Sequence, residues 1–260
     1  MTENIKIVMI GAGNLAWHLA KAFKAKNHKI VNIYSNSLDS AEKLAQMAGS
    51  IAVPEIQMID NNADLYIIAV SDKAIGLVLE SGFFNNKKVV HTAGSISMEV
   101  FGEKIKHAGV FYPLQTFSRL RNIEFSEIPV LIEANNSWFE NYLVEIAKNI
   151  SNKVLKINSE QRMKIHLAAV FANNFVNYML SLSKKFCIEN NLDFGLLYPL
   201  ISETALKAIE FGPEISQTGP ARRNDIESIE RHLELLSSRP ELHEIYKVIS
   251  KHICLAYKEL

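Results

Sequence analysis

The sequence predicts an α/β fold in which a doubly wound parallel sheet is followed by a second, all-α domain. Three observations support this expectation. A short apolar strand near the N-terminus runs directly into a glycine-rich turn and a helix. Apolar strands and helices then alternate as far as residue 157. After that point the pattern is helical, so we expect two domains, residues 1–157 and residues 158–260.

The turn after the first strand has the pattern of a dinucleotide-binding site. The strand of residues 5–10 is followed by the run GAGNLA, in which the helix begins. Gly11 permits a tight turn, Gly13 lets a diphosphate approach the helix N-terminus, and Ala16 lets helix and strand pack closely. Unpaired N–H groups and the helix dipole favour phosphate there. The pattern predicts a Rossmann-type fold, with a glycine turn of some other α/β protein as the alternative, and a cofactor held by Gly11, Gly13, Asn14, Leu15 and Ala16.

The end of the second expected strand, residues 29–34, bears on the choice of cofactor. An NAD-binding unit is expected to carry an acidic residue there, which bonds the adenosine ribose. This chain has Ser35, Asn36 and Ser37 instead, which leave room for a 2′-phosphate, and Lys43 follows as a counter-charge. The sequence therefore favours NADP, while NAD stays open because no arginine is present. Turn and N-cap chemistry is the alternative for the two serines.

The strand that begins at Leu65 ends at Val70 and Ser71. In a doubly wound sheet the loops at the carboxyl ends of strands line the ligand crevice. We therefore expect Val70 and Ser71 to contact the cofactor. Asp72 follows, and we expect it to be the N-cap of the next helix.

A cluster of small and polar residues, HTAGS, ends the next strand, residues 88–92. Small residues let the backbone approach a ligand, and a histidine beside two hydroxyls suits a polar substrate. We expect Thr92 and Ala93 to contact the cofactor, and His91 and Ser95 to contact the substrate. A structural histidine is the alternative for His91.

Two further polar residues are candidates for the substrate. Gln115 lies in a loop after another strand end, where the alternative is a rigid turn. Arg222 lies in the run TGPARRND and could hold a carboxylate or phosphate by bidentate bonds. Arg223 could do the same, and the alternative for either arginine is an ion pair with Asp225 or Glu227.

Residues 162–185 predict a long helix that is apolar on nearly every side, and such a helix is expected to be buried. Arg162, His166, Asn173 and Asn177 recur at helical spacing along one narrow stripe. Buried polar side chains need partners, which a substrate cleft or neighbouring helices would supply. We predict His166 and Asn173 as catalytic residues, because a histidine can move a proton near neutral pH and an asparagine can orient the reacting group.

Composition argues against several classes of protein. The 28 basic and 28 acidic side chains cancel, so no net charge favours nucleic acid or a membrane surface. No apolar run approaches membrane-spanning length, and residues 1–6 lead into the first strand without a signal peptide, so we expect a cytoplasmic protein. Cys187 and Cys254 lack a neighbour at ligand spacing, so we expect neither a disulfide nor a metal site. The many apolar helices favour a homodimer through the helical domain.

Several motifs together resemble a known family. GAGNLA, HTAGS, YPLQTF, the helix with Arg162, His166 and Asn173, and TGPARRND resemble bacterial proteins with a Rossmann-like domain followed by an all-α domain of unknown function, described as NADP oxidoreductases. The resemblance covers essentially the whole chain. More distantly, the layout is similar to pyrroline-5-carboxylate reductase, the β-hydroxyacid dehydrogenases and the deazaflavin-dependent NADP oxidoreductases. These relatives imply a helical dimerisation domain and a cleft between the two domains.

The resemblance leaves two functions open. The first is an NAD(P)-dependent oxidoreductase that passes hydride between nicotinamide and a small carbonyl, imine or hydroxy substrate in the cleft. The second is a catalytically silent NADP(H)-binding sensor or partner-binding protein. It is supported by Ala169, which stands four residues before Asn173, where β-hydroxyacid dehydrogenases carry a lysine. Reduction of pyrroline-5-carboxylate itself is disfavoured, because the TGPARRND loop differs from the helical domain of that enzyme.

Overall fold

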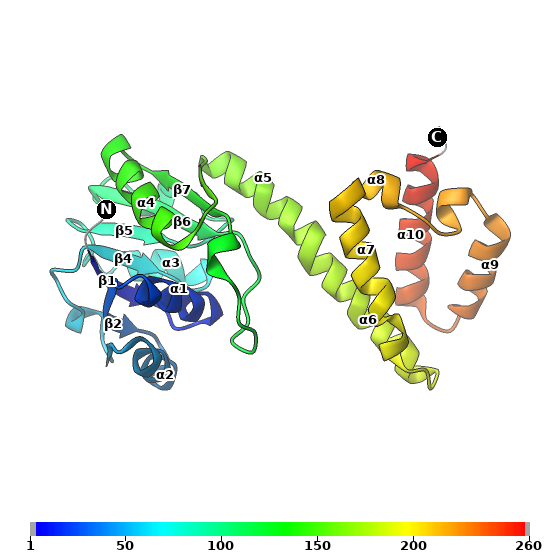
Figure 1. The fold of residues 1–260 in the computed structure, drawn as a ribbon, viewed down its shortest axis with the longest axis horizontal. Coiled ribbons are helices and arrows are strands. Elements are labelled where there is room, and N and C mark those ends of the chain that lie inside the picture. The colour runs from blue at the N-terminus through cyan, green and yellow to red at the C-terminus, as the bar shows by residue number, and fades with distance from the viewer. Residues whose placement is uncertain (1–3, 258–260) are drawn as a thin grey trace. The chain divides into compact units, whose positions relative to one another are not determined.

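The computed structural model describes residues 4–257, and the chain divides into two compact units after Asn173 (Figure 1). The strands are β1 (Lys6–Ile10), β2 (Lys29–Tyr34), β3 (Ile51–Val53), β4 (Leu65–Ile68), β5 (Lys88–His91), β6 (His107–Pro113), β7 (Val130–Ala134) and β8 (Val154–Lys156). The α-helices are α1 (Asn14–Ala25), α2 (Leu38–Ala48), α3 (Asp72–Leu79), α4 (Ser137–Ile150), α5 (Ser159–Ala169), α6 (Val176–Glu189), α7 (Tyr198–Phe211), α8 (Pro213–Ser216), α9 (Ile226–Leu235) and α10 (Pro240–Ala256). The predicted fold class is confirmed, and the domain boundary at residue 157 stays a prediction.

Within residues 4–257, eight strands form one sheet in the order β3-β2-β1-β4-β5-β6-β7-β8. Neighbouring strands are parallel except β6 and β7, which are antiparallel with Tyr112 opposite Leu131. The strand order reverses between β1 and β4, and this switch point is where doubly wound sheets bind ligands. The carboxyl ends of β1, β4, β5 and β6 therefore lie along one edge of the sheet, which we call the carboxyl edge.

The sheet is buried on both faces, because successive side chains of each strand enter two different apolar layers. Ile7 and Met9 of β1 pack with α1, α2 and α4 on one face. Val8 and Ile10 pack on the other face, with α3 and the 3₁₀ turn Met98–Phe101 (Figure 1). All four β1 side chains are fully buried. Burial on both faces explains why the strands are continuous apolar runs in the sequence.

The long helix predicted after residue 158 forms, but it is not α-helical throughout. A π-helical segment, Val170–Phe175, separates α5 from α6. A π turn takes one more residue than an α turn, so positions beyond it are rotated by about 100° from those of an unbroken α-helix. Asn173 lies inside this segment, so the α-helical spacing on which the predicted polar stripe rests holds for Arg162 and His166 only.

This helix is also less buried than its composition suggests. Leu167, Phe171 and Tyr178 expose 57%, 61% and 46% of their surface. The expectation of a buried helix was wrong for a single chain, because a helix that is apolar on all sides needs packing partners on more than one side. Exposed apolar surface of this kind is usually covered by another protein surface.

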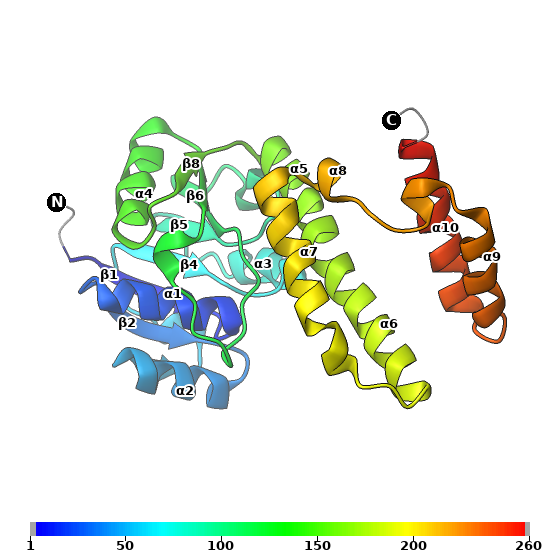
Figure 2. The same cartoon turned by 45° about the vertical axis from the view of Figure 1, so that its right-hand side comes forward.

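In the second unit α9 and α10 lie side by side (Figure 2). Asp225 is the N-cap of α9, since its side chain accepts a hydrogen bond from the Ser228 N–H group. Gly212, with a φ of +87°, ends α7 before Pro213 starts the short helix α8. No helix in residues 4–257 combines the length and apolar character needed to cross a membrane.

Candidate functional site

The glycine turn between β1 and α1 has the geometry that a diphosphate needs. Gly11 has a φ of +106°, and a Cβ there would lie 2.1 Å from the carbonyl oxygen of Ala69, so only glycine fits. Gly13 is the N-cap of α1, whose first turn contains no acidic residue. A Cβ on Gly13 would meet no heavy atom within 4 Å. The N–H groups that a helix leaves unpaired at its start thus adjoin open space, as a phosphate site requires.

A loop that follows β6 lies against this turn. The side-chain amide of Asn14 donates a hydrogen bond to the Phe117 carbonyl, with an N···O distance of 3.1 Å. Arg119 donates to the Ala12 carbonyl, and its guanidinium carbon lies 4.9 Å from the centroid of the Trp17 ring. The loop thus adds a positive charge beside the glycine turn. Sequence reasoning missed Arg119, because it lies far along the chain from the turn and in no motif.

The end of β2 presents neutral hydrogen-bonding groups, as predicted. Ser35 is partly exposed, and Asn36 and Ser37 are exposed. Ser37 is the N-cap of α2, and its side chain accepts a hydrogen bond from a backbone N–H group. This is the capping role that the sequence offered as the alternative for the serines. Lys43 forms an exposed ion pair with Asp39, with an N···O distance of 2.7 Å. The ammonium group of Lys43, which the sequence offered as the partner of a 2′-phosphate, is therefore paired with a carboxylate.

The residues after β4 lie next to the glycine turn. The Val70 side chain would lie 3.1 Å from a Cβ on Gly11, so the two segments are in close contact. Ser71 is the N-cap of α3, and Asp72 is the first residue of that helix. The prediction of Asp72 as the N-cap was wrong by one residue, and its carboxylate instead accepts a hydrogen bond from the Ser95 hydroxyl.

His91, the last residue of β5, is fully buried. Its Nδ1 accepts a hydrogen bond from the Ala93 N–H group at 3.2 Å, and its ring stacks on Phe101 at a centroid distance of 5.3 Å. Burial and then the charge of Arg162 lower the pKa of His91 to about 3, so the ring is neutral. Complete burial argues against the predicted substrate contact and for the structural alternative. Thr92 is also buried, and its hydroxyl donates to a carbonyl at the end of β4.

A tyrosine and a histidine meet at the carboxyl edge. The hydroxyl of Tyr112, near the end of β6, lies 3.1 Å from Nδ1 of His166 on α5. The backbone of Gly94 lies against both rings, since a Cβ there would be 2.5 Å from His166 Nδ1 and 2.8 Å from Tyr112 Cζ. Both side chains are partly exposed. The structure thus joins the HTAGS turn, β6 and α5 around two groups that can carry a proton.

The electrostatic surroundings of Tyr112 come from two helices. Burial and then the negative charge of Asp72 raise the pKa of the Tyr112 hydroxyl, while Arg162 acts in the opposite direction. Through its bond to Asp72, Ser95 belongs to the same cluster. The sequence placed Tyr112 at a strand end, with a rigid turn as the alternative, but gave it no role. The available signal was its place at the end of a strand, directly after the strand that ends in HTAGS.

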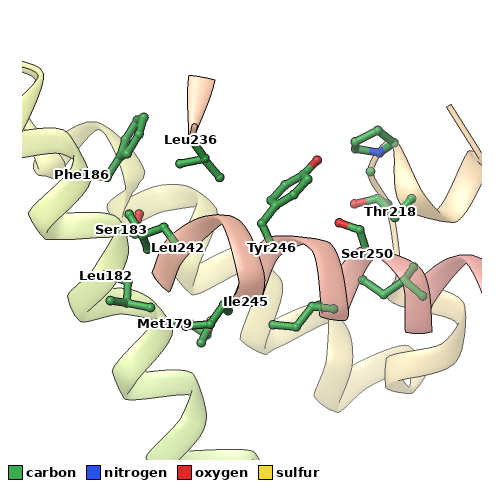
Figure 3. A pocket seen from close by; sticks show the side chains of 15 residues that line it. Met179, Leu182, Ser183, Phe186, Thr218, Leu236, Leu242, Ile245, Tyr246 and Ser250 are labelled. Carbon is green, nitrogen blue, oxygen red and sulfur yellow. The ribbon is translucent and has the colours of Figure 1, made fainter. Parts of the chain in front are cut away.

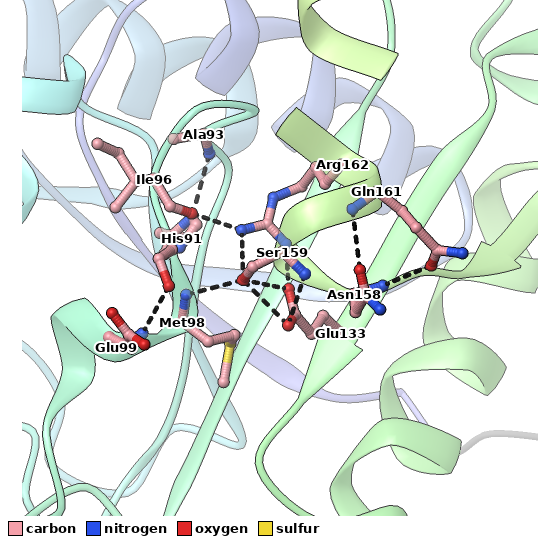
Figure 4. Close-up of polar contacts among 11 residues, drawn as sticks. His91, Ala93, Ile96, Met98, Glu99, Glu133, Asn158, Ser159, Gln161 and Arg162 are labelled. Atoms are coloured by element: carbon pink, nitrogen blue, oxygen red, sulfur yellow. Dashed lines mark hydrogen bonds and ion pairs between the residues drawn. The ribbon is translucent and has the colours of Figure 1, made fainter. Parts of the chain in front are cut away.

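A buried ion pair fixes the start of α5 to the sheet (Figure 4). Arg162 is 1% exposed, and its guanidinium pairs with Glu133 of β7 and donates to the Ile96 carbonyl. The Ser159 hydroxyl also bonds the Glu133 carboxylate at 2.9 Å. These contacts hold the first turn of α5, and His166 lies one turn further along the same helix. The place of His166 at the carboxyl edge is therefore well determined.

Three of the predicted residues lie outside this cluster. Gln115 is exposed in the loop after β6, where its Oε1 accepts a hydrogen bond from the Thr116 N–H group. Asn173 is exposed in the π-helical segment at the end of the first unit. Arg222, in the second unit, stacks over Tyr257 at 4.3 Å from the ring centroid. The substrate roles of Gln115 and Arg222 and the catalytic role of Asn173 stay predictions.

The second unit contains a pocket of about 420 Å³ (Figure 3). Its walls are mostly apolar, with Met179 and Phe186 from α6 and Ile245 from α10. Tyr246 also lines it, and its hydroxyl lies 2.8 Å from Nδ1 of His232. This lining suits apolar packing, whereas the pair of Tyr112 and His166 lies in the first unit.

Two families match the chain. Residues 6–94 match the family described as NADP oxidoreductase, coenzyme F420-dependent, and residues 128–253 match a domain of unknown function, DUF2520. A Bacteroides fragilis protein, named as a candidate NADP oxidoreductase, is 42% identical over 97% of this chain and 98% of its own, with a TM-score of 0.91. The chain belongs to this family of NADP oxidoreductases. The resemblance found in the sequence is thereby confirmed.

Other solved structures share the fold of this NADP oxidoreductase. A Thermotoga maritima protein is 26% identical over 97% of this chain and 98% of its own, with a TM-score of 0.73. A pyrroline-5-carboxylate reductase from Coxiella burnetii is 18% identical over 99% of this chain and 98% of its own, with a TM-score of 0.59. No curated protein sequence matches the chain. The first family match ends at Gly94 and the second begins at Ile128, so Tyr112 lies in neither.

Proposed function

We propose that this oxidoreductase passes hydride between NADP(H) and a small carbonyl, imine or hydroxy substrate at the carboxyl edge of its sheet. One observation supports this most: an open glycine turn and the pair of Tyr112 and His166 belong to the same unit and the same edge. When bound, the nicotinamide supplies or accepts the hydride. The residues of the chain hold the cofactor, orient the substrate and move the proton.

The proposed cofactor site follows the predicted residues. The diphosphate binds the first turn of α1, where Arg119 adds a positive charge. The adenosine end lies near the neutral groups after β2, which favours NADP and leaves NAD as the weaker ligand. The nicotinamide lies toward the ends of β4 and β5. The residues concerned are Gly11, Gly13, Asn14, Leu15, Ala16, Ser35, Asn36, Ser37, Val70, Ser71, Thr92 and Ala93.

The proposed substrate site begins at His166 and Ser95, which the structure brings into one cluster with Tyr112. Asn173 and Gln115, which belong to the same unit, are proposed as substrate-orienting residues, and the role of Arg222 stays a prediction from the sequence. In this proposal His91 acts only by supporting the turn that follows it, because its ring is buried.

We further propose a cytoplasmic homodimer that forms through the helical domain, residues 158–260. The support is the apolar surface of the long helix, on which Leu167 and Phe171 are more than half exposed. A second copy that covers this surface would provide the burial that the sequence led us to expect. The substrate is a small molecule, and the balanced charge favours neither nucleic acid nor a membrane as a partner.

Nucleotide binding is tested first with two matched glycine variants. Gly13→Ala places its methyl group in open space, so we expect unchanged stability but an NADPH affinity at least about 10-fold lower in calorimetric titration. Gly76→Ala, on α3, also meets no neighbouring atom and should bind NADPH as the wild type does. If neither NADPH nor NADH produces heat or a thermal shift with the wild type, the proposed function is overturned.

A second function, that of a silent NADP(H)-binding sensor, is favoured by Ala169 at the position of the missing lysine. The two functions differ in turnover. A panel of aldehydes, 2-oxo acids and cyclic imines is mixed with NADPH and the protein, and nicotinamide absorbance is followed. Oxidation of NADPH supports the enzyme. Micromolar binding without oxidation by any member of the panel supports the sensor.

A further inference from the structure

The contact between Tyr112 and His166 gives the two side chains different tasks. Nδ1 of His166 is occupied by the Tyr112 hydroxyl at 3.1 Å, so this nitrogen cannot face a substrate at the same time. The phenol has one hydrogen and two lone pairs, and the bond to His166 uses only one of these groups. Tyr112 thus keeps a hydrogen-bonding position for a third partner. Its ring also touches the backbone of Gly94, in the turn proposed to lie beside the nicotinamide.

We propose that Tyr112 is the catalytic residue that gives the substrate heteroatom its proton during reduction and takes it back during oxidation. His166 is a positioning residue that acts through Tyr112. This inference rests on the proposed function and deepens it, because it assigns the proton to a residue that received no role from the sequence and that lies outside both family matches.

The step balances as follows for reduction of a carbonyl or imine. Hydride from reduced nicotinamide adds to the substrate carbon, and the electron pair of the C=O or C=N double bond moves to oxygen or nitrogen. That atom takes the proton from the Tyr112 hydroxyl. The tyrosinate oxygen takes the Nδ1 proton of His166 as solvent delivers a proton to Nε2 of the same ring, so the imidazole ends the step neutral. The partial exposure of His166 gives solvent access to the side chain. Oxidation of an alcohol or amine follows the same steps in reverse.

The hydrogen bond between Tyr112 and His166 can support the reaction in either direction, reduction or oxidation, depending on which of the two side chains donates. When Nδ1–H donates to the phenol oxygen, the phenol hydrogen points to the substrate and favours reduction. When the phenol donates to Nδ1, its oxygen accepts from a substrate hydroxyl and favours oxidation. The charged groups around Tyr112 are Asp72 from α3 and Arg162 from α5. Asp72 opposes formation of the tyrosinate and Arg162 supports it.

The test compares four variants. Tyr112→Phe removes the hydroxyl, His166→Phe removes the hydrogen bond but retains a ring, and His166→Asn can restore a donor to Tyr112. Tyr142→Phe is the matched control, since this half-buried tyrosine lies on α4 beside Lys88, at the opposite end of β5 from His91. NADPH binding is measured by calorimetry, and turnover is measured with the aldehyde, 2-oxo acid and imine panel.

We expect Tyr112→Phe to lower kcat about 100-fold or more with NADPH affinity unchanged. His166→Phe should lower kcat about 10-fold or more, and His166→Asn should recover part of the loss. Tyr142→Phe should behave as the wild type. The inference is overturned if Tyr112→Phe retains the turnover of the wild type, an outcome that leaves the proposed function intact. Absence of NADPH binding by the wild type would overturn both.

A spectroscopic measurement decides the matter even if no member of the panel is reduced. The chain is labelled with ¹³C at tyrosine Cζ, and the Tyr112 signal is identified by its loss in Tyr112→Phe. We expect the pKa of Tyr112 to rise in His166→Phe, and to be lower with NADP⁺ than with NADPH because the oxidised ring is positively charged. A Tyr112 pKa that neither His166→Phe nor the oxidation state of the nucleotide changes would overturn the inference.

Discussion

The backbone of Gly94 lies against the imidazole of His166, so closely that a Cβ on Gly94 would be 2.5 Å from Nδ1. The same Cβ would be 2.8 Å from Cζ of Tyr112. Because residue 94 is glycine, the backbone of the HTAGS turn can lie in contact with the side chains of Tyr112 and His166. No other residue type allows the same approach.

We expect Gly94→Ala to displace both rings, to lower turnover about 10-fold or more, and to cost about 1–3 kcal/mol of stability through overpacking. Urea unfolding and NADPH oxidation measure the two effects. The control is Gly76→Ala, whose methyl group meets no atom within 4 Å and which should gain about 0.5–1 kcal/mol in its helix. If Gly94→Ala is as stable and active as Gly76→Ala, the close packing has no functional consequence.

Much of the first unit was predictable from local patterns. The run from Ile7 to Ile10 sends alternate side chains into two apolar layers, so it is apolar throughout. Such runs mark strands of a covered parallel sheet, and the turns between them mark the carboxyl edge. The position of Val70 beside Gly11 followed from this rule alone. The doubly wound sheet thus followed from the order of strands and helices, whereas the antiparallel pairing of β7 with β6 did not.

The site was only partly predictable, because it depends on contacts between distant segments. Tyr112 is an ordinary strand residue until α5 brings His166 to it. Arg119 comes to the glycine turn only because its loop reaches Ala12. The π-helical segment could not be predicted either. Residues 170–175 fit an α-helical pattern, and none of them is of a type that demands the wider π turn. The α-helical spacing that relates Asn173 to His166 in the prediction therefore does not hold through this segment.

The ion pair of Arg162 and Glu133 should be the most sensitive polar contact of the first unit. Glu133→Gln leaves the guanidinium, which is 1% exposed, without its carboxylate, and should cost about 3–5 kcal/mol in urea unfolding. The control is Glu160→Gln, which breaks an exposed pair with Lys164 on the same helix and should cost about 0.5 kcal/mol or less. Similar costs for the two variants would contradict this interpretation.

Stability should fall in mild acid because of His91. Its pKa is lowered to about 3 from the ordinary value of 6.5, so below pH 6.5 the unfolded chain binds a proton that the folded protein excludes. The protein is therefore most stable above pH 6.5 and loses stability toward pH 3, with a loss from His91 of about 2 kcal/mol at pH 5.

The measurement is urea unfolding at pH 7.5 and pH 5. At pH 7.5 we expect His91→Gln to be less stable than the wild type. Between pH 7.5 and pH 5, however, its free energy of unfolding should fall by about 2 kcal/mol less than that of the wild type. His252→Gln, which removes an exposed histidine of α10, should keep the pH dependence of the wild type. An unchanged pH dependence in His91→Gln would show that other groups cause the loss.

Arg119 should contribute to affinity for the diphosphate that NADPH and NADH share. Its guanidinium lies at the Ala12 carbonyl, inside the glycine turn, whereas the 2′-phosphate that distinguishes NADPH is expected at the end of β2. Arg119→Ala should therefore weaken binding of both nucleotides by a similar factor of about 10, as loss of one charge-assisted contact would. The exposed Arg121, two residues further along the loop, provides the control variant Arg121→Ala, which should bind both nucleotides normally. Selective loss of NADPH affinity would instead assign Arg119 to the 2′-phosphate. Unchanged affinity for both nucleotides would leave Arg119 with the single task of holding its loop to the turn.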